Sequence, residues 1–181
     1  MKRVISYLTL FVVSLSLGVG NQSMAQDKNS NLDSFRENIL GNLSSPNPGV
    51  RESALQLINQ YSVELGLKTD ETDSEALGSF RKNLEANLAS SNFGVRQSAM
   101  QLIAQYGDRF ELNRDAIFSL MRTYRYEKDI NFRKMALAAL HKTQDKWAME
   151  FLKISLRFEE NQSLKHIIEA IVFDYESALA P

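Results

Sequence analysis

The sequence predicts an all-α protein in which about four helical hairpins stack as a solenoid. Three observations predict this fold: a long internal repeat, helical periodicity in both of its copies, and weaker copies further along the chain. The segment "SFRENILGNLSSPNPGVRESALQLINQYS" (34–62) returns 45 residues later as "SFRKNLEANLASSNFGVRQSAMQLIAQYG" (79–107), with 18 of 29 positions identical. A repeat period of about 20 to 50 residues is typical of solenoids and repeat arrays.

Each copy of the repeat predicts two antiparallel helices. In the second helix the apolar residues follow the spacing i, i+4, i+7, i+8, i+11, which places them on one face. These residues are Val50, Ala54, Leu57, Ile58 and Tyr61 in the first copy and Val95, Ala99, Leu102, Ile103 and Tyr106 in the second. The preceding helix carries Phe35, Ile39 and Leu43, or Phe80, Leu84 and Leu88. The joints "SSPNPG" and "SSNFG" are rich in turn-forming residues.

A stable stack needs about three hairpins or more, so further copies of the apolar pattern are expected. Two of them follow along the chain. The third copy, 82 residues after the first, contains Phe132, Ala136, Ala139 and Leu140. The fourth, 114 residues after the first, contains Leu164, Ile168, Ile171, Val172 and Tyr175. We therefore expect a single domain over 33–178, with repeats at about 33–66, 74–107, 113–142 and 145–178.

A polar pair recurs in step with the apolar pattern. Asn47, Asn92, Asp129 and Asn161 each lie four residues before a basic residue, namely Arg51, Arg96, Arg133 and Lys165. Asn or Asp at the start of a helix accepts hydrogen bonds from the unpaired amides of the first turn. We interpret the basic residues as a structural ladder that reaches acidic or amide groups of the adjoining hairpin, with anion binding as the alternative.

These residues resemble the HEAT repeat. The segments "GVRESALQLI" and "GVRQSAMQLI" are similar to its second helix, "DINFRKMALAAL" fits well, and "NQSLKHIIEAIV" keeps the pattern loosely. The resemblance covers about 34–178 and implies a right-handed α-solenoid of about four HEAT-like helical hairpins. It also implies a protein-binding scaffold, although such a fold specifies function weakly.

The first residues predict a secretory signal peptide. A basic start at Lys2 and Arg3 is followed by the apolar run "VISYLTLFVVSLSLGVG" and by small residues at Ser23 and Ala25. We expect residues 1–25 to be removed near Ala25 and 26–32 to be a disordered leader, so that the exported protein is periplasmic or secreted and is not held in a membrane. An uncleaved anchor is the alternative, but the run is at the lower limit of the roughly 20 residues that span a bilayer.

Composition excludes several classes of function. The chain has no cysteine, which rules out thiol chemistry, disulfides and Cys-based metal sites. Without Lys2 and Arg3 the formal net charge changes from −1 to −3, which does not indicate a nucleic-acid partner. No Gly-rich phosphate loop, G-x-S-x-G or H-E-x-x-H motif occurs. We expect no catalytic residues and no cofactor.

Two histidines are the candidate metal ligands. His141 closes the third unit, and His166 precedes Glu169 by one helical turn. A zinc site needs three or four such ligands. Since the chain has no second His-carboxylate pair of this kind, we expect no metal site, and the metal hydroxylases among HEAT-like proteins are not supported.

Aromatic residues offer two further candidates. In "MRTYRYEKD" (121–129), Arg122 and Arg125 alternate with Tyr124 and Tyr126, a pattern that can stack on bases or sugars. We favour a solvated helix end with one tyrosine packed beneath it. Trp147 is the single tryptophan, and we expect it in the core between helices rather than in a ligand site.

Four glutamines are the candidate partner-binding residues. Gln56 and Gln60, and their copies Gln101 and Gln105, lie off the apolar face and one turn apart, so stacking aligns them in a row. Glutamine side chains donate and accept hydrogen bonds, which suits a protein partner. The alternative is that duplication copied neutral surface residues.

The connection "VELGLKTDETDSEALG" (63–78) separates the first two units and is acidic through Glu71, Asp73 and Glu75. We expect it to prolong the second helix of unit one, to form a loop and then to start the next unit at a Ser or Asp cap. Binding of a cation or a basic partner is the alternative, but the carboxylates lack calcium-loop spacing.

The sequence therefore predicts a non-enzymatic protein-binding scaffold or adaptor of the periplasm or cell envelope. One alternative is a structural subunit of a larger envelope assembly that uses the ends of the solenoid. The other is a HEAT-like lyase or cofactor-handling protein, which would require a cleft with convergent ionisable groups.

Overall fold

A computed structural model describes residues 34–63, 65 and 74–180. Expectations for the signal peptide 1–25, the leader 26–32, and Glu71 and Asp73 of the acidic connection lie outside these residues. The chain divides into two units, Met1–Phe35 and Arg36–Pro181, and the packing below concerns the second of them.

Every regular element of the described residues is a helix, which confirms the all-α prediction. Residues 34–43 are helical. The helices that follow are α3 (Pro48–Gln60), α4 (Ser74–Leu88), α5 (Phe93–Tyr106), α6 (Arg114–Tyr126), α7 (Ile130–Thr143), α8 (Lys146–Ser155) and α9 (Gln162–Leu179), with a 3-10 helix η1 (Gly107–Arg109) after α5.

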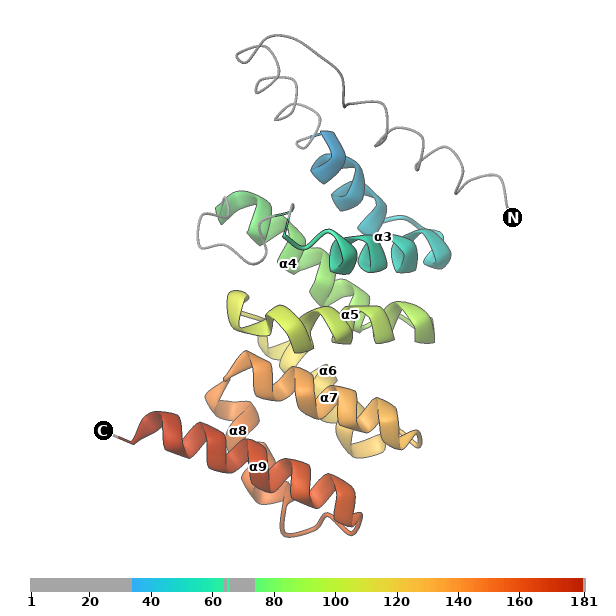
Figure 1. Ribbon diagram of the computed structural model, residues 1–181. Helices are drawn as coiled ribbons and strands as arrows, with labels where there is room; N and C mark the ends of the chain where they lie inside the picture. The colour runs from blue at the N-terminus through green and yellow to red at the C-terminus, as the bar shows by residue number, and fades with distance from the viewer. Residues whose placement is uncertain (1–33, 64, 66–73, 181) are drawn as a thin grey trace. The chain divides into compact units, whose positions relative to one another are not determined.

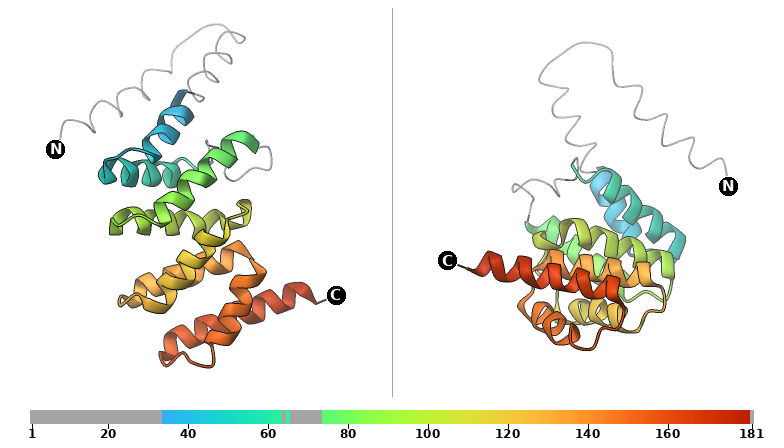
Figure 2. Two further views of the ribbon diagram at one scale, coloured as in Figure 1. Left: turned by 180° about the vertical axis from the view of Figure 1, so that it is seen from behind. Right: turned by 60° about the horizontal axis from the view of Figure 1, so that its bottom comes forward.

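Second helices pack on second helices, and first helices pack on first helices. In the first of these rows α5 contacts α3 and α7, and α7 also contacts α9 (Figure 1). In the other row α6 contacts α4 and α8, as the view from behind shows (Figure 2). The rows are joined because α4 packs on α5, α6 on α7 and α8 on α9.

The core follows the predicted apolar face, and it is most complete in α5. All five apolar residues predicted for α5 are buried: Val95, Ala99, Leu102, Ile103 and Tyr106. The prediction missed one buried position in α3, α5 and α7, at the edge of the apolar face. It is occupied by Leu55, Met100 and Leu137, whose exposed fractions are 0%, 1% and 0%. A helix that lies between two neighbours buries more than one narrow stripe, and this is why the simple periodicity fell short.

The burial expected for α3 is only partly correct. Ala54 and Ile58 are buried, but Val50, Leu57 and Tyr61 are intermediate. At the position in α5 that matches Tyr61, Tyr106 donates a buried 2.7 Å hydrogen bond to Ser62 beyond the end of α3. The edge of α5 that carries Tyr106 therefore contacts the preceding second helix. α3 is the first second helix in the described residues, so its matching edge has no preceding second helix there to bury it. In α9, Val172 is likewise intermediate, whereas the other four predicted residues are buried.

The expected continuation of the second helix of unit one is not seen. α3 ends at Gln60, and the next described residues, 61–63, form turns. Tyr61 is the C-cap, and its amide still donates to the carbonyl of Leu57. The prediction for this junction was therefore wrong in the part that the structure describes.

Candidate functional site

Each second helix begins at the polar residue of the recurring pair. Asn47, Asn92, Asp129 and Asn161 occupy the N-caps of α3, α5, α7 and α9. Their side chains accept hydrogen bonds from the amides of Gly49, Val95, Asn131 and Phe132, and Leu164, respectively. These bonds satisfy first-turn amides that have no partner within the helix.

Each arginine donates to a carbonyl oxygen within its own hairpin. The sequence interpretation expected contacts with the adjoining hairpin only. Arg51 and Arg96 donate through Nη1 to the carbonyl oxygens of Ser45 and Ser90, at 2.5 Å and 2.8 Å. Arg133 donates through Nε to the carbonyl oxygen of Tyr124, at 2.7 Å. Tyr124 lies in the last turn of α6, where carbonyls lack an internal partner and carry the negative end of the helix dipole. Ser45 and Ser90 instead lie in the joints, two residues after the preceding helix ends.

Two of the basic residues also reach the next hairpin, as the ladder requires. Arg51 Nη2 lies 3.3 Å from Ser90 Oγ, and Arg133 Nη2 lies 2.6 Å from Glu159 Oε2. Arg96 and Lys165 make no such side-chain bond to another hairpin within the described residues. The ladder is therefore partial.

The acceptors of these contacts share a position that the sequence interpretation overlooked. Ser45, Ser90 and Glu159 each stand two residues before an N-cap and accept a hydrogen bond from the amide of that cap residue. Aligning the joints on the caps places these three residues in register, so the signal was present in the sequence. One polar side chain thus fixes the entry to a helix and, at two joints, receives an arginine from the preceding hairpin.

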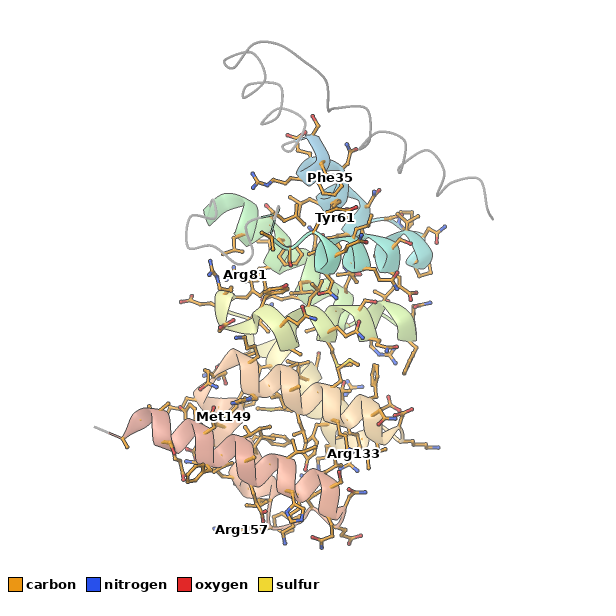
Figure 3. All side chains as sticks on the ribbon, viewed as in Figure 1. Phe35, Tyr61, Arg81, Arg133, Met149 and Arg157 are labelled. Atoms are coloured by element: carbon orange, nitrogen blue, oxygen red, sulfur yellow. The ribbon has the colours of Figure 1, made fainter. Side chains whose placement is uncertain are left out.

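A polar pocket of about 370 Å³ lies at the joint between the third and fourth hairpins. Figure 3 marks Arg133 at the start of α7, on the side where the chain enters α9. The residues that line the pocket are Tyr124, Arg125, Arg133, Ser155, Phe158, Glu159, Glu160 and Asn161.

Glu159 lines the pocket, and both of its carboxylate oxygens accept hydrogen bonds. Its Oε2 accepts hydrogen bonds from the Tyr124 hydroxyl at 2.7 Å and from Arg133, while its Oε1 accepts from the Asn161 amide at 3.0 Å. The side chain of Glu159 is 6% exposed and that of Arg133 is 21% exposed. A carboxylate buried to this degree needs such donors, because desolvation of an unpaired charge is costly.

Tyr124 is held in its neutral form. Burial, the hydrogen bond to Glu159 and the negative charge of Glu159 raise the pKa of Tyr124 well above its ordinary value of 10.0, while Arg133 opposes the shift. The Arg133 guanidinium lies 5.3 Å from the centre of the Tyr124 ring. Tyr124 is thus a hydrogen-bond donor in this wall, and its buried position fits the expectation of one tyrosine packed beneath the helix end.

Ser155 is the buried residue of this wall whose side chain is not paired. It is 3% exposed, it lines the pocket, and its Oγ has no hydrogen-bond partner among the residues that the structure describes. A buried hydroxyl without a partner loses the free energy of its bonds to water. Around it, Arg125, Phe158 and Glu160 are exposed, and the side chains of Arg125 and Glu160 make no hydrogen bond or ion pair within the described residues.

The four glutamines lie on α3 and α5 at equivalent positions. Gln56, Gln60 and Gln105 are exposed, and Gln101 is intermediate. Gln56 Nε2 donates to Glu52 Oε1 at 3.4 Å. α3 and α5 pack on each other, so the four side chains come from neighbouring helices.

The equivalent positions in the third and fourth hairpins do not carry glutamine. The positions of Gln56 and Gln101 are taken by the exposed Ala138 and Ala170 in α7 and α9. Those of Gln60 and Gln105 are taken by Lys142 and Asp174, which pair with Asp108 and His141 at 2.7 Å each. The glutamine row therefore belongs to the first two hairpins only.

Both histidines form pairs with carboxylates on the surface. His141 Nε2 lies 2.7 Å from Asp174 Oδ2, and His166 Nδ1 lies 3.3 Å from Glu169 Oε2. No cluster of three or more His, Asp or Glu side chains suitable for a metal ion is found in the described part of the chain.

The expectation for Trp147 was wrong. The side chain is 44% exposed, and the guanidinium of Arg114 lies 5.9 Å from the centre of its ring. Trp147 is the second residue of α8, where the inward face is formed by Ala148, Met149 and Leu152. Arg122, Arg125 and Tyr126 of the neighbouring Arg-Tyr motif are exposed as well.

No described helix has the length and apolar character to cross a membrane. A scan against models of known protein families gives no match, and a search of curated proteins gives no significant one.

Proposed function

We propose that this protein is a non-enzymatic binding scaffold, built from four HEAT-like hairpins stacked as a right-handed α-solenoid. Support comes from the internal repeat and from the resemblance of "GVRESALQLI" and "GVRQSAMQLI" to a HEAT second helix. The contacts of α5 with α3 and α7, and of α7 with α9, run in the order that stacking requires. In such arrays each unit contacts only its neighbours and presents a repeated surface to a partner.

The observation that carries the proposal is the pair of glutamine positions shared by α3 and α5. α5 buries its predicted apolar face and α3 buries part of it, yet Gln56, Gln60 and Gln105 remain exposed and Gln101 is half-buried. A protein segment that crosses both helices meets amide groups at regular intervals. Each amide can donate and accept, so it can pair with main-chain groups of a partner.

We also propose that the protein acts in the periplasm or cell envelope, or outside the cell. The basis is the basic start, the apolar run and the small residues up to Ala25. The partner is accordingly an envelope or secreted protein.

Capture of partners from envelope extracts tests the proposal. Mutation of all four glutamines to glutamate keeps the side-chain length, adds four negative charges and removes the amide donors. We expect the variant to recover at least about tenfold less of a specific partner than the wild type does. The added charges repel acidic groups of the partner, and the lost amide donors remove hydrogen bonds. N-terminal sequencing of the exported protein gives the cleavage point in the same experiment.

A matched variant separates this effect from a general effect of charge. It places four glutamates at exposed positions in, or directly after, the first helices of the same two hairpins, namely Asn42, Ser79, Ala86 and Ala89. The control should capture the partner as well as the wild type does. Equal recovery by all three proteins would show that the glutamine row is not the binding surface.

A further inference from the structure

The pocket between the third and fourth hairpins holds more hydrogen-bond donors than the fold uses. Arginine has five N–H donors. Of those in Arg133, Nε binds the carbonyl oxygen of Tyr124 and Nη2 binds Glu159, while Nη1 makes no bond within the described residues. Ser155 lines the same pocket, and its buried hydroxyl has no partner in the described part of the chain.

The charges of the lining residues show which ligand chemistry suits these donors. Glu159 already accepts from three donors, and its charge is balanced by Arg133. Arg125 and Glu160 remain as unpaired charges at the exposed edge. With Arg133 and Glu159 paired, one guanidinium (Arg125) and one carboxylate (Glu160) remain, so the free donors decide between ligands. An ammonium group would find a single free acceptor, Glu160. A carboxylate would instead find Arg125, the free N–H groups of Arg133 and the hydroxyl of Ser155.

We propose that this pocket binds a carboxylate group carried next to an apolar group. The carboxylate oxygens accept hydrogen bonds from Arg133 Nη1, Ser155 Oγ and the guanidinium of Arg125, and pairing of guanidinium with carboxylate is strong and directional. The apolar neighbour covers Phe158, which is 69% exposed at the same pocket. The volume of about 370 Å³ is within the usual range of small-ligand pockets, about 300–1,000 Å³.

The inference deepens the proposed binding function and rests on it in one respect, namely that a protein partner supplies the carboxylate as an acidic side chain. A free organic acid has the same chemistry. The pocket is formed by α6, α7, the end of α8 and the segment that leads into α9, whereas the glutamines belong to α3 and α5. The two surfaces can therefore be tested separately.

Titration of the purified protein, followed by amide chemical shifts, tests the pocket directly. The probes are 3-phenylpropionate, its neutral analogue 3-phenylpropionamide, and two end-blocked tetrapeptides with Glu-Phe or Gln-Phe at the centre. We expect saturable shifts around the pocket residues with the phenylpropionate or the Glu-Phe peptide, and none with the neutral analogues. Binding of the free acid alone identifies a small organic acid as the ligand, and tighter binding of the peptide identifies a partner side chain.

Three substitutions that spare the internal contacts sharpen the test. Arg125→Gln and Ser155→Ala should each weaken binding of the charged probes about fivefold or more. Glu160→Gln should strengthen it about twofold to fivefold, because it removes a like charge. Lys128→Gln removes one positive charge from an exposed residue outside the pocket lining, and it should leave the affinity unchanged.

Thermal unfolding checks whether these variants keep the fold. Arg125 and Glu160 make no side-chain bond within the described residues, and loss of the unpartnered Ser155 hydroxyl should leave the melting temperature equal or higher. The inference is overturned if neither acid probe shifts the pocket residues at millimolar concentration. Equal shifts with the neutral probes, or variants that bind like the wild type, also overturn it. Because these titrations use no partner protein, their failure is distinct from a failure of partner capture by the glutamine row.

Discussion

Arg133 contacts both its own hairpin and the next one. Its Nε binds the carbonyl oxygen of Tyr124 in the last turn of α6, and its Nη2 pairs with Glu159 before α9. The planar guanidinium can make both bonds at once because its donors point in fixed, different directions. Lysine has a single ammonium group, and Lys165 in the fourth hairpin makes no comparable pair within the described residues.

Tyr124 gives this contact a pH dependence. Burial and Glu159 raise the pKa of Tyr124 above its ordinary value of 10.0, so the unfolded chain releases this proton at a lower pH than the folded protein. The stabilisation is fully present below about pH 10 and is lost as the pH rises above it. Tyr124→Phe should lower the free energy of unfolding by about 1.5–3 kcal/mol near pH 7, because it removes a hydrogen bond to a charged group.

Urea unfolding between about pH 8 and about pH 11 checks this prediction. The wild type should lose stability above about pH 10 more steeply than Tyr124→Phe does. Tyr126, which is 73% exposed, provides the control, because Tyr126→Phe should keep the wild-type slope. Parallel curves for the wild type and Tyr124→Phe would contradict the assignment of a raised pKa.

At this scale the sequence predicted the residues better than their partners. The repeated spacing located the caps and the arginines, because both depend on position within one helix. It did not reveal that Arg96 stays in its own joint while Arg133 reaches Glu159, since this depends on what the next joint offers. At the pocket, "MRTYRY" drew attention to Tyr124 and Arg125, but Ser155 carried no sequence signal because its importance lies in its burial.

Among the elements, the second helices differ according to their neighbours. α5 contacts both α3 and α7, and the residues on both edges of its apolar face are buried. In α3 the edge of Val50 and Leu57 is intermediate, while the opposite edge at Leu55 is 0% exposed. Periodicity of one helix defines the centre of its buried face, but the width of that face is set by contacts between hairpins, which one-dimensional spacing does not contain.

The N-caps provide a prediction at the scale of the element. Asn92→Ala removes the bond to the Val95 amide and should lower the free energy of unfolding by about 1 kcal/mol. Asn92→Asp keeps an acceptor beside the positive end of the α5 dipole and should be neutral or slightly stabilising. Urea unfolding measures both changes. Asn131→Ala alters an exposed residue inside the first turn of α7 and serves as the control; if it costs as much as Asn92→Ala, the capping bond is not the cause.

Within Arg36–Pro181, one position of the second helices is buried in three successive hairpins. Positions 55, 100 and 137 are equivalent by the repeat spacing, and each carries Leu or Met with an exposed fraction of 1% or less. The equivalent residue in α9 is Glu169, which is exposed. α9 is the last of the described second helices, so a charged residue at this position suits an edge that no further helix covers within the described residues. An apolar residue there would instead expose hydrocarbon to water.

A matched pair of truncations at this position tests whether burial between successive hairpins stabilises the whole domain. Leu137→Ala should lower the free energy of unfolding by about 2–5 kcal/mol, because it leaves a cavity between packed helices. Glu169→Ala should change it by less than about 0.5 kcal/mol, because its bond to His166 joins two exposed side chains. Urea unfolding of both variants against the wild type gives the two values. Comparable losses would mean that the outer edge of α9 is packed as that of α7 is, which would contradict the exposure of Glu169.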